Sequence, residues 1–352
     1  MKPTIARLDS TTAPALLRLM PQVWVQDWDP DFFPETFRWR YLDKPSDGGT
    51  WLALDNELCV AVFDSYLRPY LLNGCRILMR ETCDWFCLPN YRRFGLGLKL
   101  LCLMMDAPEP IITVGPTDAG ISIMLPLGWQ RLSDVQRMVL PLTLRSLAGN
   151  LLRRREVRHA KYARAIPGFV PVRSPRIAPP PAADARVEEW RSGQSLSMPI
   201  PQGDGLLELL ELADLEWICA APPGFIRPIV LDFLFGRVPV GLSVSQLEPS
   251  ASGPDARIVH LQISDASQPI ADWIVSETAR RLAQAGAGVI RCRASTPQKV
   301  VALRKTGFIA APAESVYWWA KDGTPPPSII DLGYLRASDA LPFEAAATLR
   351  AH

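Results

Sequence analysis

Apolar and polar positions in the first 145 residues predict a sheet with helices packed against it. Runs typical of strands occupy residues 50–55, 58–72, 77–89, 111–114 and 135–142. Segments with helical spacing occupy residues 10–20, 30–42, 98–106 and 117–129. The last of these elements follow the order strand, loop, helix, strand, helix, strand. This order indicates an α/β arrangement in which helices cover a sheet.

The pattern changes after residue 143. Six basic residues and one glutamate lie between Arg153 and Arg164, and prolines then recur from residue 167 to residue 181. We interpret this region as a helical extension followed by a stiff linker. The basic run is a solvated helix face, an additional clamp for phosphates, or a patch for an anionic surface.

The second half resembles a weak copy of the first. Trp39 and Trp129 are 90 residues apart, and Trp217 and Phe308 are 91 residues apart. The later member of each pair follows a glycine and precedes an apolar strand pattern, "VQRMVLPL" or "VYWWA". The spacing predicts an internal duplication.

Composition narrows the function classes. The chain of 352 residues has 38 basic and 36 acidic residues, so no global field favours a nucleic-acid partner. Seven scattered cysteines and three histidines predict neither a disulfide framework nor a metal site. His260 lies in an apolar strand pattern and is expected in the core. No apolar run reaches about 18 residues and the N-terminus lacks a leader pattern, so we expect a cytoplasmic protein without a transmembrane segment.

The segment "PNYRRFGLG" at residues 89–97 places two glycines between a predicted strand and a predicted helix. The first N–H groups of a helix have no acceptor within it, and the helix dipole adds positive charge there. Gly95 and Gly97 let an anion approach the backbone, and Arg92 and Arg93 can add charge-assisted contacts. The pattern predicts a diphosphate site or, alternatively, an ordinary strand–turn–helix junction. It does not match the dinucleotide fingerprint, because Leu100 replaces the third glycine.

This segment resembles the acyl-CoA diphosphate loop of the GNAT acetyltransferase superfamily, whose pattern is Pro-x-x-Arg-(Gly/x)-x-Gly-(Ile/Leu)-Gly. The "LGW" turn at residues 127–129, followed by a strand, is similar to the ending that the family uses. The resemblance covers residues 3–142 well. It covers residues 195–322 in outline, where "HLQISDASQPI" at residues 260–270 has no glycine at the loop position.

The resemblance implies an α/β (α+β) fold with two GNAT-like domains. Each would be a mixed, largely antiparallel sheet whose central parallel strands splay apart between flanking helices. Residues 1–145 would form an acyl-CoA-binding domain, and residues 146–190 the basic extension and Pro-rich linker. Residues 191–345 would form a degenerate second domain that shapes the acceptor site or mediates homodimer formation.

An acyl-CoA is the cofactor that the resemblance implies, with acetyl-CoA as the first expectation. The residues expected to contact it end the strand and begin the helix: Cys87, Leu88, Arg92, Arg93, Phe94, Gly95, Leu96, Gly97 and Leu98. A backbone N–H of Leu88 or of its neighbour would polarise the thioester carbonyl.

Two carboxylates on the preceding strand, Glu81 and Asp84, are the candidate general bases. A strand period of two places them on opposite faces, so only one can face the acceptor. Glu81 lies nearer the position that some family members use, and we prefer it. The alternative is a solvated carboxylate or one paired with Arg76 or Arg80.

The acceptor side is expected at "FRWRYLDKP", residues 37–45, where Arg38, Trp39 and Tyr41 would bind a sugar or another small polar molecule. Alternatively, these aromatic side chains belong to the core and the arginines are solvated. Many family members carry a tyrosine acid four residues before the glycine of the closing turn. Met124 and Leu303 stand at those positions, so the general acid stays unassigned.

Three functions follow from the resemblance. The first is an acyl-CoA-dependent N- or O-acyltransferase in which an amine or amino sugar attacks the thioester directly. The second is an acyl-CoA-binding or regulatory protein without catalysis, which the missing tyrosines favour. The third is a peptidoglycan-bridge type of aminoacyltransferase, which also has paired GNAT-like domains. The glycines of the 89–97 segment argue against this third function.

Overall fold

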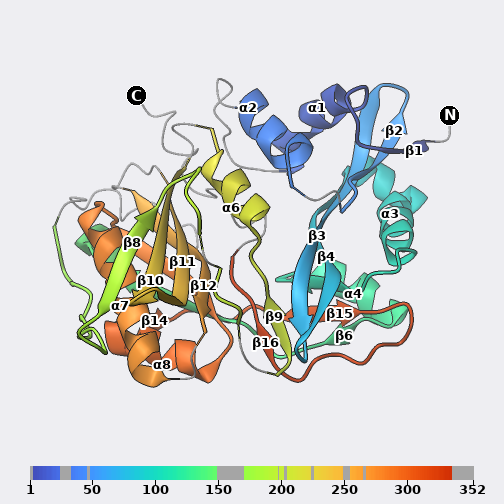
Figure 1. Cartoon of the computed structure of the whole chain (residues 1–352). Helices are drawn as coiled ribbons and strands as arrows, with labels where there is room; N and C mark the ends of the chain where they lie inside the picture. Colours follow the sequence, from blue (N-terminus) through green and yellow to red (C-terminus); the bar gives the residue numbers. More distant parts are fainter. Residues whose placement is uncertain are drawn as a thin grey trace.

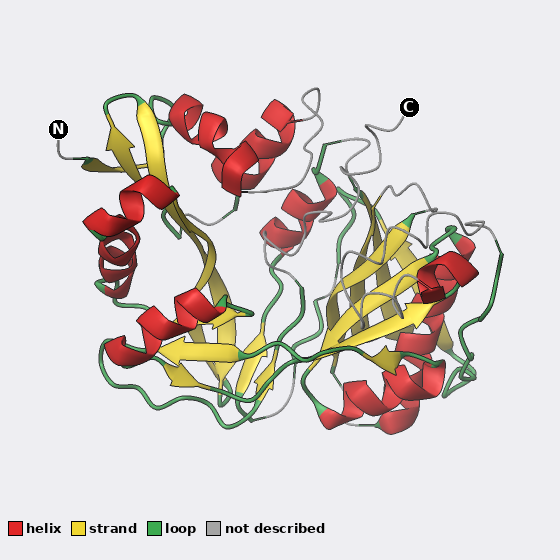
Figure 2. Ribbon diagram, turned by 180° about the vertical axis from the view of Figure 1, so that it is seen from behind, coloured by secondary structure: helices red, strands yellow, loops and turns green. Residues whose placement is uncertain are grey.

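The computed structural model describes residues 3–23, 33–45, 48–148, 170–196, 198–201, 204–222, 226–248, 254–264 and 267–334. Two mixed sheets lie side by side, each with helices packed against it (Figures 1 and 2). This arrangement confirms the predicted two-domain α/β fold. The predicted basic run between residues 153 and 164 lies outside the described residues.

The first sheet contains nine strands. Its main path is β1 (Thr4–Arg7), β2 (Trp51–Asp55), β3 (Leu58–Leu72), β4 (Cys75–Cys87), β5 (Ile111–Val114), β15 (Val316–Trp319) and β6 (Gln130–Arg131). β9 (Leu206–Glu208) pairs with the end of β3, and β16 (Ile330–Asp331) pairs with β9. β4 and β5 run parallel, as do β9 and β16.

The second sheet contains seven strands and repeats the same plan. Its path is β14 (Ile309–Ala310), β7 (Gln136–Pro141), β13 (Val289–Ala294), β12 (Asp255–Ile263), β11 (Val238–Glu248), β10 (Arg227–Phe235) and β8 (Ala185–Trp190). Its parallel pair is β12 with β13. β12 and β13 therefore correspond to β4 and β5 of the first sheet.

Helices connect and cover the strands. In the first half these are α1 (Ala13–Val23), α2 (Phe33–Phe37), the π-helical turn η1 (Arg38–Leu42), the 3₁₀ turn η2 (Pro89–Phe94), α3 (Leu96–Met105), α4 (Asp118–Met124) and the 3₁₀ turn η3 (Leu125–Leu127). In the second half they are α6 (Leu212–Cys219), α7 (Gln268–Gln284) and α8 (Pro297–Thr306). No described helix is both long and apolar enough to cross a membrane.

The long hairpin of β3 and β4 is dictated locally. β3 spans the predicted residues 58–72 and buries most of its side chains. Asn73 and Gly74 then adopt positive φ angles of 51° and 79°. An Asn-Gly pair with both residues at positive φ makes the tight turn whose twist matches that of paired strands. The hairpin therefore fixes the register of β4, which carries the candidate catalytic carboxylates.

The closing strand of each half joins the sheet of the other half. β7 follows β6 in the chain but pairs with β13 and β14 in the second sheet. β15 follows β14 but pairs with β5 and β6 in the first sheet. The apolar patterns predicted both strands but not this exchange. Each sheet is therefore completed by residues from the other side of the linker region.

The two tryptophans that suggested the duplication meet at the contact between the halves. Trp39 and Trp217 stack with ring centroids 4.6 Å apart. Trp39 Nε1–H donates to the Trp217 carbonyl at 2.8 Å, and Trp217 Nε1–H donates to the Trp39 carbonyl at 2.9 Å. Reciprocal contacts of equivalent residues are the mark of a two-fold relation. Together with the matching strand orders, they confirm the internal duplication.

The exchange predicts that the N-terminal half cannot fold alone. We expect a fragment of residues 1–145 to be insoluble, because without β15 it leaves β5 unpaired along one edge. A matched fragment carrying residues 312–321 on a flexible linker should be soluble and should show a cooperative thermal transition. Equal solubility and melting of the two fragments, measured by sedimentation and circular dichroism, would contradict the importance of the exchanged strand.

Candidate functional site

A gap opens between the two parallel strands of the first sheet. β4 pairs with β5 only at Arg80 with Ile111 and Glu81 with Ile112. Beyond Glu81, β4 continues to Cys87 and remains paired with β3. The free edge of β4 therefore faces an opening toward the carboxyl ends of both strands. Ligands of α/β sheets commonly bind at such positions.

A bulge in β4 lies at this opening. The ladder with β3 shifts between Val62 and Asp64, where Asp84 and Trp85 lie opposite the single residue Phe63. Asp84 has a φ of 40°, a left-handed conformation that is costly for a residue with a side chain. A bulge bends its strand and redirects side chains. It therefore places Asp84 beside Cys83, on the face opposite to the one that strict alternation predicts.

The glycine segment forms an open cradle at the end of β4. Gly95 has a φ of 66° and begins α3, and a Cβ built there would meet no atom within 4 Å. The first bond into the helix after this glycine runs from Lys99 N–H to the Gly95 carbonyl at 2.9 Å. The amides of Leu96, Gly97 and Leu98 precede it, so they have no acceptor within the helix.

Two arginines and an aromatic ring border this cradle. Arg92 Nε donates to the Cys87 carbonyl at 3.1 Å, and Arg93 lies 4.9 Å from the Phe94 ring centroid. Both arginines are exposed, and Phe94 is 54% exposed. Positive charge, helix amides and open space suit a diphosphate at this place. The residues therefore fit the anionic part of a coenzyme A.

Trp85 and Cys87 line the wall of the gap below the cradle. Trp85 Nε1–H donates to the Gly97 carbonyl at 3.1 Å, and its ring reaches to 3.5 Å from the place of a Gly120 Cβ. The ring thus spans the space between the first turns of α3 and α4. Burial raises the pKa of the Cys87 thiol, although the Gly97 amide and Arg92 act against the shift. The Cys87 side chain is therefore an uncharged thiol in the wall of the gap.

The amide that faces the gap belongs to Cys87. Leu88 N–H donates to the Val60 carbonyl at 2.9 Å, so this amide is engaged within the sheet. Alternate residues of an antiparallel strand direct their N–H groups to the same neighbour. The Cys87 N–H therefore points away from β3. Of the two amides expected to polarise a carbonyl, Cys87 has the suitable direction.

The two candidate carboxylates lie in different environments. Glu81 is 1% exposed and accepts a hydrogen bond from the Tyr70 hydroxyl. It lies directly below the gap, on the last parallel pair of β4 with β5. Asp84 accepts hydrogen bonds from Arg40 at 2.5 Å and from the Tyr41 hydroxyl at 2.6 Å. Burial raises the pKa of Asp84, and the charge of Arg40 opposes that shift.

Asp84 belongs to a buried network of charges. Asp64 accepts hydrogen bonds from Lys44 at 2.8 Å, from the Thr50 hydroxyl at 2.5 Å and from the Cys83 thiol at 3.2 Å. Asp64, Cys83 and Asp84 offer atoms within 4.8 Å of one another, a spacing that could hold a metal ion. Lys44 and Arg40 already supply positive charge to both carboxylates. We therefore assign the cluster to an ion-pair network.

The three residues expected to bind an acceptor diverge in space. Arg38 is exposed, pairs with Asp43 at 3.2 Å and lines an open groove with Glu216 of α6. Trp39 is buried against Trp217, as described above. Tyr41 is buried and reaches Asp84. Only Tyr41 therefore contacts a side chain beside the gap.

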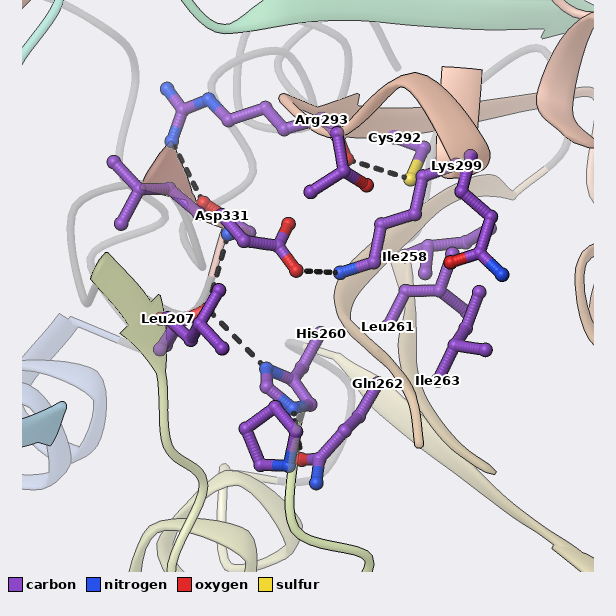
Figure 3. Close-up of a pocket in the computed structure, with 16 residues that line it drawn as sticks. Leu207, Ile258, His260, Leu261, Gln262, Ile263, Cys292, Arg293, Lys299 and Asp331 are labelled. Carbon is purple, nitrogen blue, oxygen red and sulfur yellow. Dashed lines mark hydrogen bonds and ion pairs between the residues drawn. The ribbon is translucent and has the colours of Figure 1, made fainter. Parts of the chain in front are cut away.

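A second gap opens in the second sheet. β12 pairs with β13 from Asp255 to Ile258 and then continues past His260 to Ile263, paired with β11 but no longer with β13. His260 Nδ1 lies 3.3 Å from Glu208, so this buried histidine is partnered, as expected for the core (Figure 3). The chain after β12 has no glycine before α7, and α7 carries a proline in its first turn. The second gap therefore lacks the cradle of the first.

Sequence reasoning missed the buried ions between the halves. Arg68 is 0% exposed and lies 3.6 Å from Asp214, and its charge also acts on Glu81 and Glu208. Burial acts to raise the pKa of Glu208, but the hydrogen bond and charge of His260 lower it overall. Arg68 and Asp214 are 146 residues apart in sequence, and Glu208 and His260 are 52 residues apart. No local pattern marks them.

The fold is that of the GCN5-related N-acetyltransferases. Such an enzyme from Anabaena variabilis matches with a TM-score of 0.57 and 11% identity, over 90% of this chain and 72% of the other. A tandem GNAT protein from the clavulanic acid biosynthesis pathway gives 0.54 and 13%, over 90% and 98% of the chains. An N-myristoyltransferase from Saccharomyces cerevisiae, solved with myristoyl-CoA, gives 0.55 and 10%, over 90% and 82%.

No family model and no curated protein matches the chain. The structural matches therefore stand on the arrangement of strands and helices alone. They confirm the expected superfamily fold, and the roles of individual site residues stay predictions.

The Asp84 network gives a stability prediction. We expect Asp84→Asn to lower the free energy of unfolding by about 3–5 kcal/mol, because it leaves the charge of Arg40 buried without its carboxylate. Asp43→Asn is the matched control, since its pair with Arg38 is exposed and should contribute about 0–1 kcal/mol. Urea titrations of the three proteins compare these costs. A similar midpoint for both variants would show that the buried pair has no special weight.

Proposed function

We propose that this protein is an acyl-CoA-dependent acyltransferase that acts on an amine or hydroxyl acceptor. The observation that carries the proposal is the gap beyond Glu81 and Ile112, which lies beside the glycine-opened start of α3. A gap alone is a feature of the fold. The cradle next to it is specific to the first half, and its charge matches a diphosphate.

The cradle would hold the cofactor by its anionic end. The amides of Leu96 and Leu98 and the side chains of Arg92 and Arg93 would contact the diphosphate, while the Gly97 amide faces the Cys87 thiol. Bound acyl-CoA supplies a thioester, an activated carbonyl that an acceptor can attack. The Cys87 N–H would donate to the thioester carbonyl oxygen as negative charge develops there. Acetyl-CoA is the first cofactor to test, because it is the expectation from the loop pattern.

Glu81 is the better candidate for the general base. Its carboxylate lies at the point where β4 and β5 separate, and its Tyr70 partner fixes its orientation. Asp84 is engaged by Arg40 and Tyr41, so protonating it would remove the negative charge that pairs with the buried Arg40 guanidinium. Glu81 would take the proton of the acceptor, and Asp84 would hold the bulge that shapes the gap.

The second half would complete the acceptor side. Trp217 stacks on Trp39, and Asp214 approaches Arg68 on the face of the first sheet that also carries Glu81. An acceptor approaching Glu81 from this face would therefore meet both halves. A small polar acceptor such as an amino sugar suits these charged and aromatic neighbours.

A second candidate function is acyl-CoA binding without transfer. Met124 is 3% exposed and Leu303 is 0% exposed, so apolar core side chains occupy both positions where the family often carries a tyrosine acid. Thiol release measured with acetyl-CoA and a panel of amines and amino sugars decides between the two functions. Binding without any release would favour the regulatory function.

Coenzyme binding tests the cradle directly. We expect Gly95→Asp to weaken acetyl-CoA binding at least about ten-fold in isothermal titration, because it places a carboxylate beside the diphosphate. Gly97→Asp should weaken binding as well, and its Cβ would also press within 3.2 Å of Trp85 Nε1. Gly193→Asp is the matched control, because Gly193 also has a positive φ and open space around its Cβ. Equal affinity of wild type and Gly95→Asp would remove the basis of the proposal.

The assignment of the base predicts a separate effect on turnover. With an acceptor found in the panel, Glu81→Gln should lower kcat by about 10²–10⁴-fold, because a glutamine amide cannot take a proton. Its affinity for acetyl-CoA should stay within about two-fold of wild type, since Glu81 lies outside the cradle. Steady-state kinetics and titration together check this. Full activity of Glu81→Gln would exclude Glu81 as the base.

A further inference from the structure

The gap in the second half contains a small, partly open cavity. It lies beyond the last parallel pair, Ile258 with Cys292, and has a volume of about 70 Å³ (Figure 3). By this measure a buried water needs about 10–15 Å³, so the cavity has room for about five waters or one small organic molecule. β12, β13, the first turn of α8 and the segment around β16 form its walls.

Side chains in these walls hold hydrogen-bond donors without acceptors. Gln262 is 3% exposed, and its Oε1 lies 3.1 Å from His260 Nε2. Its amide nitrogen has no partner among the residues that the structure describes. The Thr296 hydroxyl, at the N-cap of α8, is also buried without a partner in the described part of the chain. A buried donor that stays unpaired is costly, so each of these groups calls for a ligand or water.

Positive charge borders the same cavity. The first bond within α8 runs from Val300 N–H to the Thr296 carbonyl at 3.1 Å, so the Lys299 amide has no acceptor inside the helix. The Lys299 ammonium also lines the cavity, where it pairs with Asp331 at 2.6 Å. A helix start with an adjacent lysine favours an anion.

The carboxylates of the cavity are already engaged. Glu208 accepts from the Gly333 amide at 3.1 Å and lies against His260. Asp331 is held by Lys299. The groups in the cavity walls that still lack a described hydrogen-bond partner are therefore donors, so a ligand must supply acceptor atoms. A diphosphate does not suit the site, because no glycine lets it approach the backbone after β12.

We propose that this cavity is a second ligand site, which binds a small carboxylate. One carboxylate oxygen accepts from Gln262 Nε2 and the other from the Thr296 hydroxyl and the first turn of α8. Lys299, which pairs with Asp331, lies beside it. The site is separate from the coenzyme cradle and does not depend on acyl transfer. It gives the second half a binding role of its own.

Histidine NMR on the full-length protein tests this proposal. The chain has three histidines, so ¹³Cε1-histidine labelling gives few signals, and replacing His159 and His352 by glutamine leaves that of His260. Sodium acetate is the probe. Acetamide, which has the same shape without the charge, and sodium chloride, which matches the ionic strength, are the controls.

We expect the His260 signal to shift with acetate to a plateau and to respond to neither control. Thr296→Val and Gln262→Leu should each raise the apparent dissociation constant about ten-fold or more, because each removes a donor to a charged group. Thr278→Val is the matched control. It also removes a buried hydroxyl without a described partner, but on α7 and outside the cavity walls.

Thermal melts of all variants separate loss of binding from loss of folding. A saturable acetate response that Thr296→Val weakens and Thr278→Val leaves unchanged supports the site. No saturable response, an equal response to acetamide or chloride, or equal affinity of wild type and Thr296→Val would overturn it. Neither result depends on coenzyme binding, so failure here leaves the proposed acyl transfer untouched.

Discussion

The buried ion pair of Arg40 and Asp84 holds the end of β4 in its bulged form. Asp84 occupies a costly left-handed conformation, and the two hydrogen bonds to its carboxylate offset that cost. A bulge bends its strand, and this one lies beyond the last pair of β4 with β5, where the gap opens beside the cradle. A buried ion pair is rarely the most stable filling of a core. Its presence here is explained by the geometry that it fixes.

The gap also depends on the second half, because the exchanged strands bind the halves together. β15 covers β5, the strand on the far side of the gap, and buries Trp318 completely. In the second sheet, β7 pairs with β13 along the equivalent edge. The reciprocal bonds of Trp39 and Trp217 then fix one half against the other. Neither gap is thus the property of one half, since residues from the other half complete the sheet in which it lies.

Local features of this fold could be predicted from sequence, and long-range ones could not. The apolar run at 58–72 and the glycines at 95 and 97 determine their own structure, so the strand and the cradle were predicted. The patterns of residues 136–141 and 316–319 predict strands but contain nothing that selects a sheet. Strict alternation along the strand predicted Asp84 on the face opposite to Glu81. The bulge breaks this alternation and places Asp84 on the other face. No local sequence pattern marked Arg68 and Glu208 as buried ions, because their partners are distant in sequence.

The two gaps share one strand plan but differ in the groups that line them. The first has glycines and arginines that leave backbone amides open to a large external anion. The second lacks that cradle in the described residues, and donors without a described partner lie beside the first turn of α8. Arg68, Glu81, Glu208 and His260 connect the space below one gap to the wall of the other. In a low-dielectric interior the state of one such charge acts on its neighbours. The buried ions thus form a connected set of charges between Glu81, below the first gap, and His260, in the wall of the second.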